Sequence, residues 1–185
     1  TNPESPSSFL TPKWNGTAEP NAKIELYGNA ACTGGAVATG FAKQDGTFSI
    51  NAGVAVNTVT TLYALGKDAA GNSSNCSSGF SYIHDDTEPT LVVFTGSTPD
   101  SPTNATLQPL IEGIADPNSL ITLYTTDDCS GSTAATGTAS PDGTFAIQVT
   151  VNDNAETLIS ATSTDAAANV SPCSPDPYAF THDNI

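Results

Sequence analysis

Residues 60–72 read TTLYALGKDAAGN, and residues 159–169 read ISATSTDAAAN. Each segment starts with the alternating side chains of a β-strand and ends in an Asp-Ala-Ala turn. A shift of 97 residues aligns both cysteine pairs and two Asp-Gly-Thr-Phe segments, and it brings these two segments together as well. The matched positions are Cys32 with Cys129, Cys76 with Cys173, and residues 45–48 with residues 142–145. The chain therefore contains one module twice, and this repeat governs every further inference.

The length and the composition fit two small β-domains. A chain of 185 residues with this repeat divides into two domains of roughly 90 residues, which is enough for a self-sufficient core. Long helix-period patterns, Met and Arg are absent, as is typical of short strands joined by polar turns. No apolar run reaches the ~18 residues of a membrane helix. We expect domains at residues 1–84 and 90–182, an acidic linker at 85–89 and the start of a further linker at 183–185.

The charge differs strongly between the two halves. Residues 1–84 carry five acidic residues and all four Lys, whereas residues 85–185 carry fourteen acidic residues and neither Lys nor Arg. Such a surface repels nucleic-acid phosphates and anionic lipid, so we expect no nucleic-acid partner and no membrane insertion. Solubility in a secreted or salty setting explains the excess of acid, and attraction of cations is the alternative.

The four cysteines fall two per repeat with the same spacing. An even count at matched spacing predicts one disulfide per domain, Cys32–Cys76 and Cys129–Cys173, in an oxidising compartment. Free thiols remain an alternative, whereas a zinc site would need short ligand spacing and a neighbouring His. Cys32 and Cys76 are expected at opposite ends of the sheet. The loop around Cys32 must therefore fold back to bring the two Cα atoms close enough for a bond.

Repeat 2 predicts seven strands, and repeat 1 lacks the first of them. The apolar segment TLVVF at residues 90–94 precedes TPDSPTNA at residues 98–105, and the latter matches the N-terminal TNPESPSS. Repeat 1 has no counterpart of residues 90–94. We expect its first strand to lie outside this sequence or to be supplied from upstream, which leaves a sheet edge exposed.

Several single positions carry further expectations. Trp14 aligns with Ile111 and is expected in the core. Asp45-Gly46 and its counterpart in repeat 2 predict two-residue β-hairpins. Ala168 stands where repeat 1 has Gly71, so a positive φ is not expected at Ala168. Three acidic residues are expected to face solvent: Glu19, Glu25 and Glu112.

The order of these motifs resembles a known family. GTAEPNAKIELY at residues 16–27 is followed by DGTF, by a strand ending in DAAGN and by HDDTEP at residues 84–89. This order resembles the bacterial immunoglobulin-like repeats of large secreted and surface proteins, and the resemblance covers nearly all of both repeats. It implies an all-β fold of two tandem Ig-like Greek-key β-sandwiches with about seven strands each, domain 1 lacking its first strand. The Cys…Trp…Cys order of antibody domains is absent, because Trp14 precedes the first Cys.

The acidic linker suggests a metal site at the domain junction. Some similar tandem repeats hold Ca²⁺ there, and Ca²⁺ takes six to eight oxygen ligands with loose geometry. Without a cation these carboxylates would repel one another. The alternative is a solvated linker with Asp residues that cap their own turns. The hypothesis of a structural interdomain Ca²⁺ assigns these ligands: Asp85, Asp86, Glu88, Asp116, Asp142, Asp165 and Asn169.

Nothing in the sequence predicts catalysis. His84 and His182 are each followed by Asp, but both are expected at a domain edge, and no G-x-S-x-G segment supplies a nucleophile. Paired carboxylates for glycoside hydrolysis need a cleft, which a small sandwich with turn-borne Asp does not offer. We therefore expect a non-enzymatic module.

The expected function is structural. Two repeats of a long exported bacterial surface protein would form part of an extended adhesion stalk at the cell surface, with neighbouring Ig-like repeats as partners. The alternatives are a glycan- or protein-binding module and a spacer attached to an exported enzyme. An exposed cluster of tyrosines would favour binding, and the candidates are Tyr27, Tyr63, Tyr82, Tyr124 and Tyr178.

Overall fold

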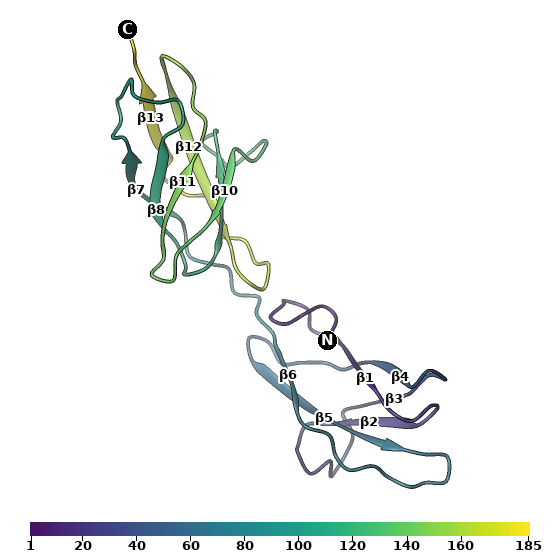
Figure 1. Ribbon diagram of the computed structural model, residues 1–185. Helices are drawn as coiled ribbons and strands as arrows, with labels where there is room; N and C mark the ends of the chain where they lie inside the picture. The colour runs from purple at the N-terminus through teal and green to yellow at the C-terminus, as the bar shows by residue number, and fades with distance from the viewer. The chain divides into compact units, whose positions relative to one another are not determined.

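The computed structural model describes all residues from 1 to 185 as two compact units, Thr1–Asp86 and Thr87–Ile185. The boundary between Asp86 and Thr87 falls inside the acidic segment 85–89. Every regular element in the structure is a β-strand (Figure 1). We call the two parts unit 1 and unit 2 and describe each by itself.

Unit 1 contains two antiparallel sheets. One has two strands in the order β1-β4, and the other has four strands in the order β3-β2-β5-β6. The strands are β1 (Lys13–Thr17), β2 (Lys23–Tyr27), β3 (Ala38–Phe41), β4 (Thr47–Asn51), β5 (Val59–Lys67) and β6 (Phe80–Ile83).

Unit 2 repeats this plan with one strand more. Its sheets have the orders β11-β8-β7 and β10-β9-β12-β13. The strands are β7 (Val93–Thr98), β8 (Leu110–Ile114), β9 (Leu120–Tyr124), β10 (Ala135–Thr138), β11 (Thr144–Gln148), β12 (Ala155–Thr164) and β13 (Tyr178–His182). Strands that neighbour one another out of chain order, such as β9 and β12, give the Greek-key arrangement of an Ig-like sandwich, as expected.

The core of each unit lies between its two sheets and consists of alternating strand side chains. In unit 1 the cluster centres on Trp14, Ile24, Ile50 and Tyr82. Trp14 is buried, as predicted, and its Nε1 donates to the carbonyl of Ala52 at 3.4 Å. Unit 2 packs the corresponding positions of β8, β9, β11 and β13 into one cluster.

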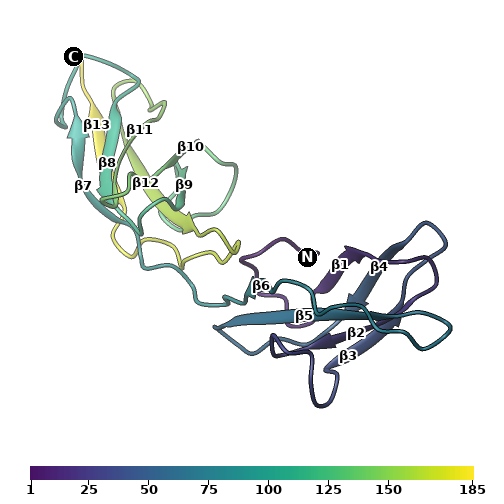
Figure 2. The ribbon, with the colours of Figure 1, turned by 60° about the horizontal axis from the view of Figure 1, so that its bottom comes forward.

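The missing first strand of repeat 1 is confirmed. β8 pairs with β11 on one side and with β7 on the other, whereas β1 pairs only with β4 (Figure 2). On the other edge of β1 the structure has a single bridge between Asn2 and Lys13, with backbone hydrogen bonds of 3.0 and 2.9 Å. The rest of that edge has no strand partner.

Two expectations about turns and strands are wrong. Asp45-Gly46 does not close a hairpin, because β3 belongs to the four-stranded sheet and β4 to the two-stranded one. The turn instead carries the chain between the sheets, with the carboxylate of Asp45 accepting from the backbone N–H and the hydroxyl of Thr47. The first strand of unit 2 was expected at residues 90–94, but the ladder begins at Val93. The residues before it are held by side chains, since Asp116 and Ser163 bond to Thr90.

Ala168 adopts the conformation that its side chain disfavours. Its φ is 68°, and φ of the equivalent Gly71 is 88°, so the expectation of a different turn in repeat 2 is wrong. The Asp165 carboxylate fixes the turn by accepting from the N–H groups of Ala167 and Asn169 at 2.8 and 2.9 Å. These bonds offset the cost of placing a Cβ in the left-handed region.

We predict that Ala168→Gly stabilises unit 2 by about 0.5 to 1 kcal/mol, because glycine adopts the positive φ of this exposed position without the steric cost of a Cβ. Calorimetric unfolding of the full chain measures the effect. Gly71→Ala in unit 1 is the reverse control and should destabilise by a similar amount. A loss of stability in Ala168→Gly would contradict this account of the turn.

Candidate functional site

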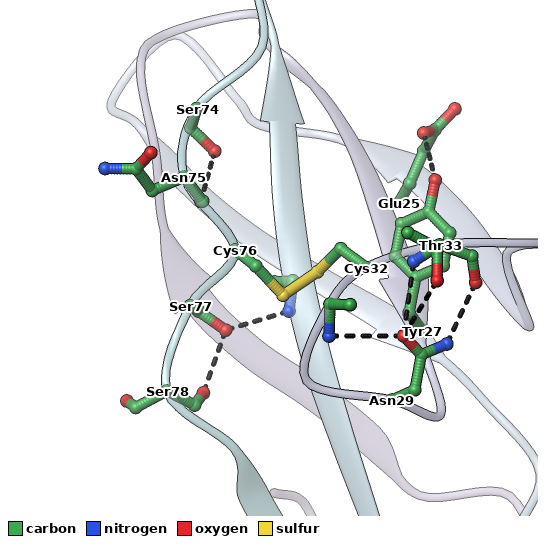
Figure 3. The surroundings of a disulfide bond; sticks show 12 residues. Glu25, Tyr27, Asn29, Cys32, Thr33, Ser74, Asn75, Cys76, Ser77 and Ser78 are labelled. Atoms are coloured by element: carbon green, nitrogen blue, oxygen red, sulfur yellow. Dashed lines mark hydrogen bonds between the residues drawn. A yellow bond between two sulfur atoms is a disulfide. The ribbon is translucent and has the colours of Figure 1, made fainter.

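Both predicted disulfides are present. The Cα atoms are 5.7 Å apart in Cys32–Cys76 and 5.8 Å apart in Cys129–Cys173, and no cysteine is free. The loop around Cys32 folds back because Asn29 organises it. The Asn29 side-chain oxygen accepts from the N–H of Ala31 and of Thr33, and its amide donates to the carbonyl of Thr33 (Figure 3). Cys32 itself takes a φ of 48°, which turns the loop toward Cys76.

Serine hydroxyls hold the other half of the disulfide against β5. The N–H of Ser77 donates to the carbonyl of Ala64 at 2.9 Å, and the Ser77 hydroxyl accepts from the N–H of Ala64 at 2.8 Å. Ser74 makes the same pair of bonds with Gly66 (Figure 3 shows both serines). The hydroxyls thus replace backbone carbonyls as acceptors, and the segment docks on the sheet without becoming a strand.

Unit 2 repeats this serine arrangement. Ser171 bonds to the backbone of Ser163, and Ser174 bonds to the backbone of Ala161, with N···O distances of 2.9 to 3.0 Å. Sequence reasoning missed these serines. Their signal was available, because S-x-C-S occurs at residues 74–77 and again at residues 171–174, at the spacing of the repeat.

We predict that Cys32→Ser together with Cys76→Ser lowers the free energy of unfolding of unit 1 by about 3 to 4 kcal/mol, since the bond no longer restricts the unfolded chain. Trp14 is the one tryptophan of the protein and lies in the core of unit 1, so its fluorescence reports on this unit alone. Cys129→Ser with Cys173→Ser is the matched control and should leave the Trp14 transition in place. An unchanged unfolding midpoint of unit 1 in the first variant would contradict this prediction, because the loop and the serines would then maintain the stability of the unit without the disulfide.

A charged cluster covers one face of the four-stranded sheet of unit 1. The carboxylate of Glu25 accepts from Lys23 Nζ at 2.9 Å, from Lys67 Nζ at 2.8 Å and from the Tyr27 hydroxyl at 2.7 Å. Glu25 is only 7% exposed, so the expectation of a solvent-facing residue is wrong. The side chains of its three partners cover it. Unit 2 has Thr122 at this position, paired with Thr136 and Thr162, and therefore lacks the cluster.

The partners of Glu25 favour its ionised form. The hydrogen bond from Lys67, followed by those from Lys23 and Tyr27, lowers the pKa of Glu25 from 4.5 to about 2. The same contacts raise the pKa of Lys67 and of Tyr27. Because the pKa of Glu25 is lower in the folded protein, this group stabilises the fold above about pH 4.5, and the contribution disappears as the pH falls toward 2.

We predict that Glu25→Gln weakens the acid sensitivity of unit 1. The wild-type melting temperature, followed by Trp14 fluorescence, should exceed that of the variant at pH 7, and the difference should shrink between pH 4.5 and pH 2. Glu19→Gln is the control, since Glu19 is exposed and lies outside the cluster. A difference that stays constant over this pH range would contradict the assignment.

The two histidines connect loops at one end of their units. His84 is 1% exposed, its Nδ1 accepts from the N–H of Asn57 at 3.0 Å, and its Nε2 therefore donates to the carbonyl of Ser8 at 3.1 Å. His182 occupies the same place in unit 2, with Nδ1 2.9 Å from the Asp153 carboxylate. These contacts assign the rings to holding loops together.

Three of the proposed calcium ligands of unit 2 accept hydrogen bonds inside the unit, two of them within their own turns. Asp116 accepts from the N–H and the hydroxyl of Thr90, Asp142 does the same with Thr144, and Asp165 bonds along its turn to Asn169. Hydrogen bonds from Thr144 also lower the pKa of Asp142. No group of three or more His, Cys, Asp or Glu side chains with a metal-holding arrangement is present. The interdomain calcium site, with Glu88 among its ligands, therefore stays a prediction.

Asp85 and Asp86 belong to the end of unit 1. The N–H of Asp85 donates to the carbonyl of Ser7 at 3.1 Å, and the N–H of Asp86 donates to the Asn57 side chain at 2.9 Å. Unit 2 ends in the same way, with the N–H of Asn184 bonded to the side chain of Asn154 at 2.8 Å. The role of Asn57 and Asn154, both with a φ of 50°, was not foreseen from the sequence.

The tyrosines do not form an exposed cluster. Tyr27 and Tyr82 are buried, and Tyr63, Tyr124 and Tyr178 are half-buried.

The structure also contains no helix of the length and apolarity that membrane crossing requires.

Comparison with known proteins identifies one family. The family model described as bacterial Ig domain matches residues 11–79 and again residues 98–175. No curated protein matches the chain.

Solved structures resemble the chain at low identity. A structure titled "Biofilm associated protein - BSP domain" is 17% identical with a TM-score of 0.38, and the match covers 97% of this chain and 28% of that one. The "D00-D0 domain of Intimin" is 13% identical with a TM-score of 0.34, covering 98% of both chains. The "Human OSCAR ligand-binding domain" is 10% identical with a TM-score of 0.40, covering 95% and 94%. These values are too low to support a function.

Proposed function

The chain belongs to the bacterial Ig domain family, and we propose that its two repeats act as a non-enzymatic spacer in an exported bacterial surface protein. The observation that carries this proposal is the anchoring of the linker at both ends. Asp85 and Asp86 are bonded to unit 1, and Thr90 is bonded to Asp116 and Ser163 of unit 2. Both sides of the acidic segment are thus held by hydrogen bonds to their own units, which suits a structural module.

The chemistry inside the units supports a structural role. The conspicuous carboxylate and imidazole groups bond to their own turns and loops, as Asp142, Asp165 and both histidines do. Each unit is also closed by a disulfide at the same place, which fits an oxidising extracellular environment and a domain exposed to mechanical or proteolytic stress. The burial of the tyrosines supports the spacer over a binding face built on them.

Replacement of residues 1–185 tests the proposal. In the full-length parent protein, this segment is exchanged for two unrelated Ig-like domains of the same length, and a deletion variant serves as the comparison. If the segment is a spacer, we expect adhesion of the bacterial cells to the surface that they colonise to survive the exchange. The deletion should reduce this adhesion at least tenfold. If the exchange abolishes attachment while the protein still reaches the cell surface, the segment is a glycan- or protein-binding module instead. If neither change affects attachment but secreted enzymatic activity falls, the segment is an enzyme spacer.

A further inference from the structure

Two edge strands of this protein, one in each unit, carry exposed apolar side chains. β3 is the edge strand of the four-stranded sheet of unit 1, and β7 is the edge strand of the three-stranded sheet of unit 2 (Figures 1 and 2). Neither has a strand partner on its outer side. Such an edge can pair with the backbone of an approaching strand, so most proteins cover it or place charged side chains on it.

The solvent-facing side of β3 is strongly apolar. Phe41 is 68% exposed, the largest fraction of any large apolar side chain in unit 1, and Val37 before the strand is 57% exposed. The alternate positions face the core, because a Cβ at Gly40 would meet the side chain of Ile50 at 2.7 Å. Val37, Thr39 and Phe41 therefore share the outer face of the edge strand.

The repeat shows that the fold does not require this apolar edge. The equivalent strand of unit 2 is β10, which pairs with β9 as β3 pairs with β2. It has Ala134 in the place of Val37 and Thr138 in the place of Phe41. The large apolar side chains on β3 are thus specific to unit 1, as expected of a contact surface.

The edge of β7 carries a matching set of side chains. Val93 is 58% exposed, the largest fraction among the large apolar strand residues of unit 2, and Leu91 is exposed on the same side. Ile114 lies opposite Val93 on β8 and extends this apolar strip. A bulge follows Phe94, so the segment with regular alternation is residues 91–94, which matches the four-residue length of β3.

A groove of 320 Å³ runs beside this segment of unit 2. Its lining consists of residues 91–94 and residues 175–178. The rings of Phe94 and Tyr178 lie next to each other there, with centroids 6.0 Å apart, and Asp176 supplies an exposed carboxylate. A strand that pairs with β7 would therefore meet apolar surface on both of its faces and one carboxylate at the groove.

The charges beside the two edges are complementary. Lys43 is exposed two residues after Phe41, and Lys23 lies opposite Phe41 on β2. Beside β7 stands Asp176, in a unit that contains neither Lys nor Arg. Complementary charges around an apolar contact determine which surfaces meet. The lysine-bearing edge of unit 1 therefore fits the acidic edge of unit 2 better than either edge fits a second copy of itself.

We propose that the edge of β3 in one copy of this chain pairs with the edge of β7 in a second copy. Backbone N–H and C=O groups of the two strands would bond to each other, with Val37 and Phe41 lying against Leu91 and Val93. The contact is heterologous, since it joins unit 1 of one copy to unit 2 of another. It adds self-association to the proposed spacer function and does not depend on it.

Sedimentation velocity of the full chain between about 10 µM and about 1 mM tests the proposal. The net charge of −15 repels a second copy, and ~0.15 M salt screens this repulsion beyond about 8 Å. We expect association with a Kd of about 0.1 mM. Phe41→Asp and Val93→Asp should each weaken it at least tenfold, because each places a carboxylate in the apolar contact.

A mixture of the two variants identifies the pairing. Phe41→Asp retains an intact β7 edge, and Val93→Asp retains an intact β3 edge. An equimolar mixture should therefore associate, although neither variant associates alone. A fluorescent label on one variant shows that the complex contains both.

Two further variants are the controls. Phe80→Asp changes an apolar side chain of unit 1 that is 57% exposed on β6, and Val170→Asp changes one of unit 2 that is 49% exposed after β12. Both should associate within twofold of the wild type. Trp14 fluorescence verifies that unit 1 is folded in each variant, and calorimetry verifies unit 2. Phe41→Thr or Val93→Thr replaces an Asp variant that does not fold.

Four results would overturn the proposal. The first is an unchanged sedimentation coefficient up to about 1 mM, and the second is a mixture of the two folded variants that does not associate. The third is association that only one of the two variants abolishes, which would indicate β3 with β3 or β7 with β7. The fourth is association that Phe80→Asp or Val170→Asp abolishes instead, which would place the contact elsewhere. None of these results bears on the spacer function, which the exchange of residues 1–185 tests.

Discussion

The covalent link between the loop after β2 and the segment after β5 is the constraint on which unit 1 depends, and its counterpart does the same in unit 2. A domain of fewer than 100 residues buries a modest core, so a bond that restricts the unfolded chain contributes a large share of its stability. The bond also determines local structure. Asn29 folds one loop toward the other, and Ser74 and Ser77 lend their hydroxyls to the edge of β5, so that the crosslinked segment stays on the sheet.

The two units reach the same fold with different surface chemistry. Unit 1 holds all four lysines, and two of them surround Glu25 on the exposed side of its larger sheet. Unit 2 has neither Lys nor Arg and has threonines at the equivalent positions. Asp142 and Asp165 of unit 2 accept hydrogen bonds from backbone N–H groups in their turns, and the bonds from Thr144 lower the pKa of Asp142.

Much of the architecture follows from the repeat and from alternation. The internal match of 97 residues predicts two domains, the cysteine spacing predicts the pairing, and the absence of a counterpart to residues 90–94 predicts the open edge of β1. Turn chemistry was less informative, because Asp-Gly permits a tight turn without specifying whether the flanking strands pair. The sequence likewise assigned Glu25 to the solvent, since strand alternation does not reveal that neighbouring long side chains cover a carboxylate. The sequence also did not reveal that Asp116 accepts hydrogen bonds from Thr90, 26 residues earlier in the chain, because spacing alone does not show which segments meet.

The position of the crosslink determines how far each unit extends under tension. When the chain is pulled from its ends, force passes through the sulfur atoms, and the residues between the two cysteines of a unit remain a slack loop that bears no load. The sequence separation is 44 residues in both bonds, so each one conceals roughly 150 Å of contour length. When a repeat unfolds with its disulfide intact, its contour length therefore increases by only about half as much as it would after reduction of the bond. The redox state of the surroundings thus determines the maximum extension of each repeat.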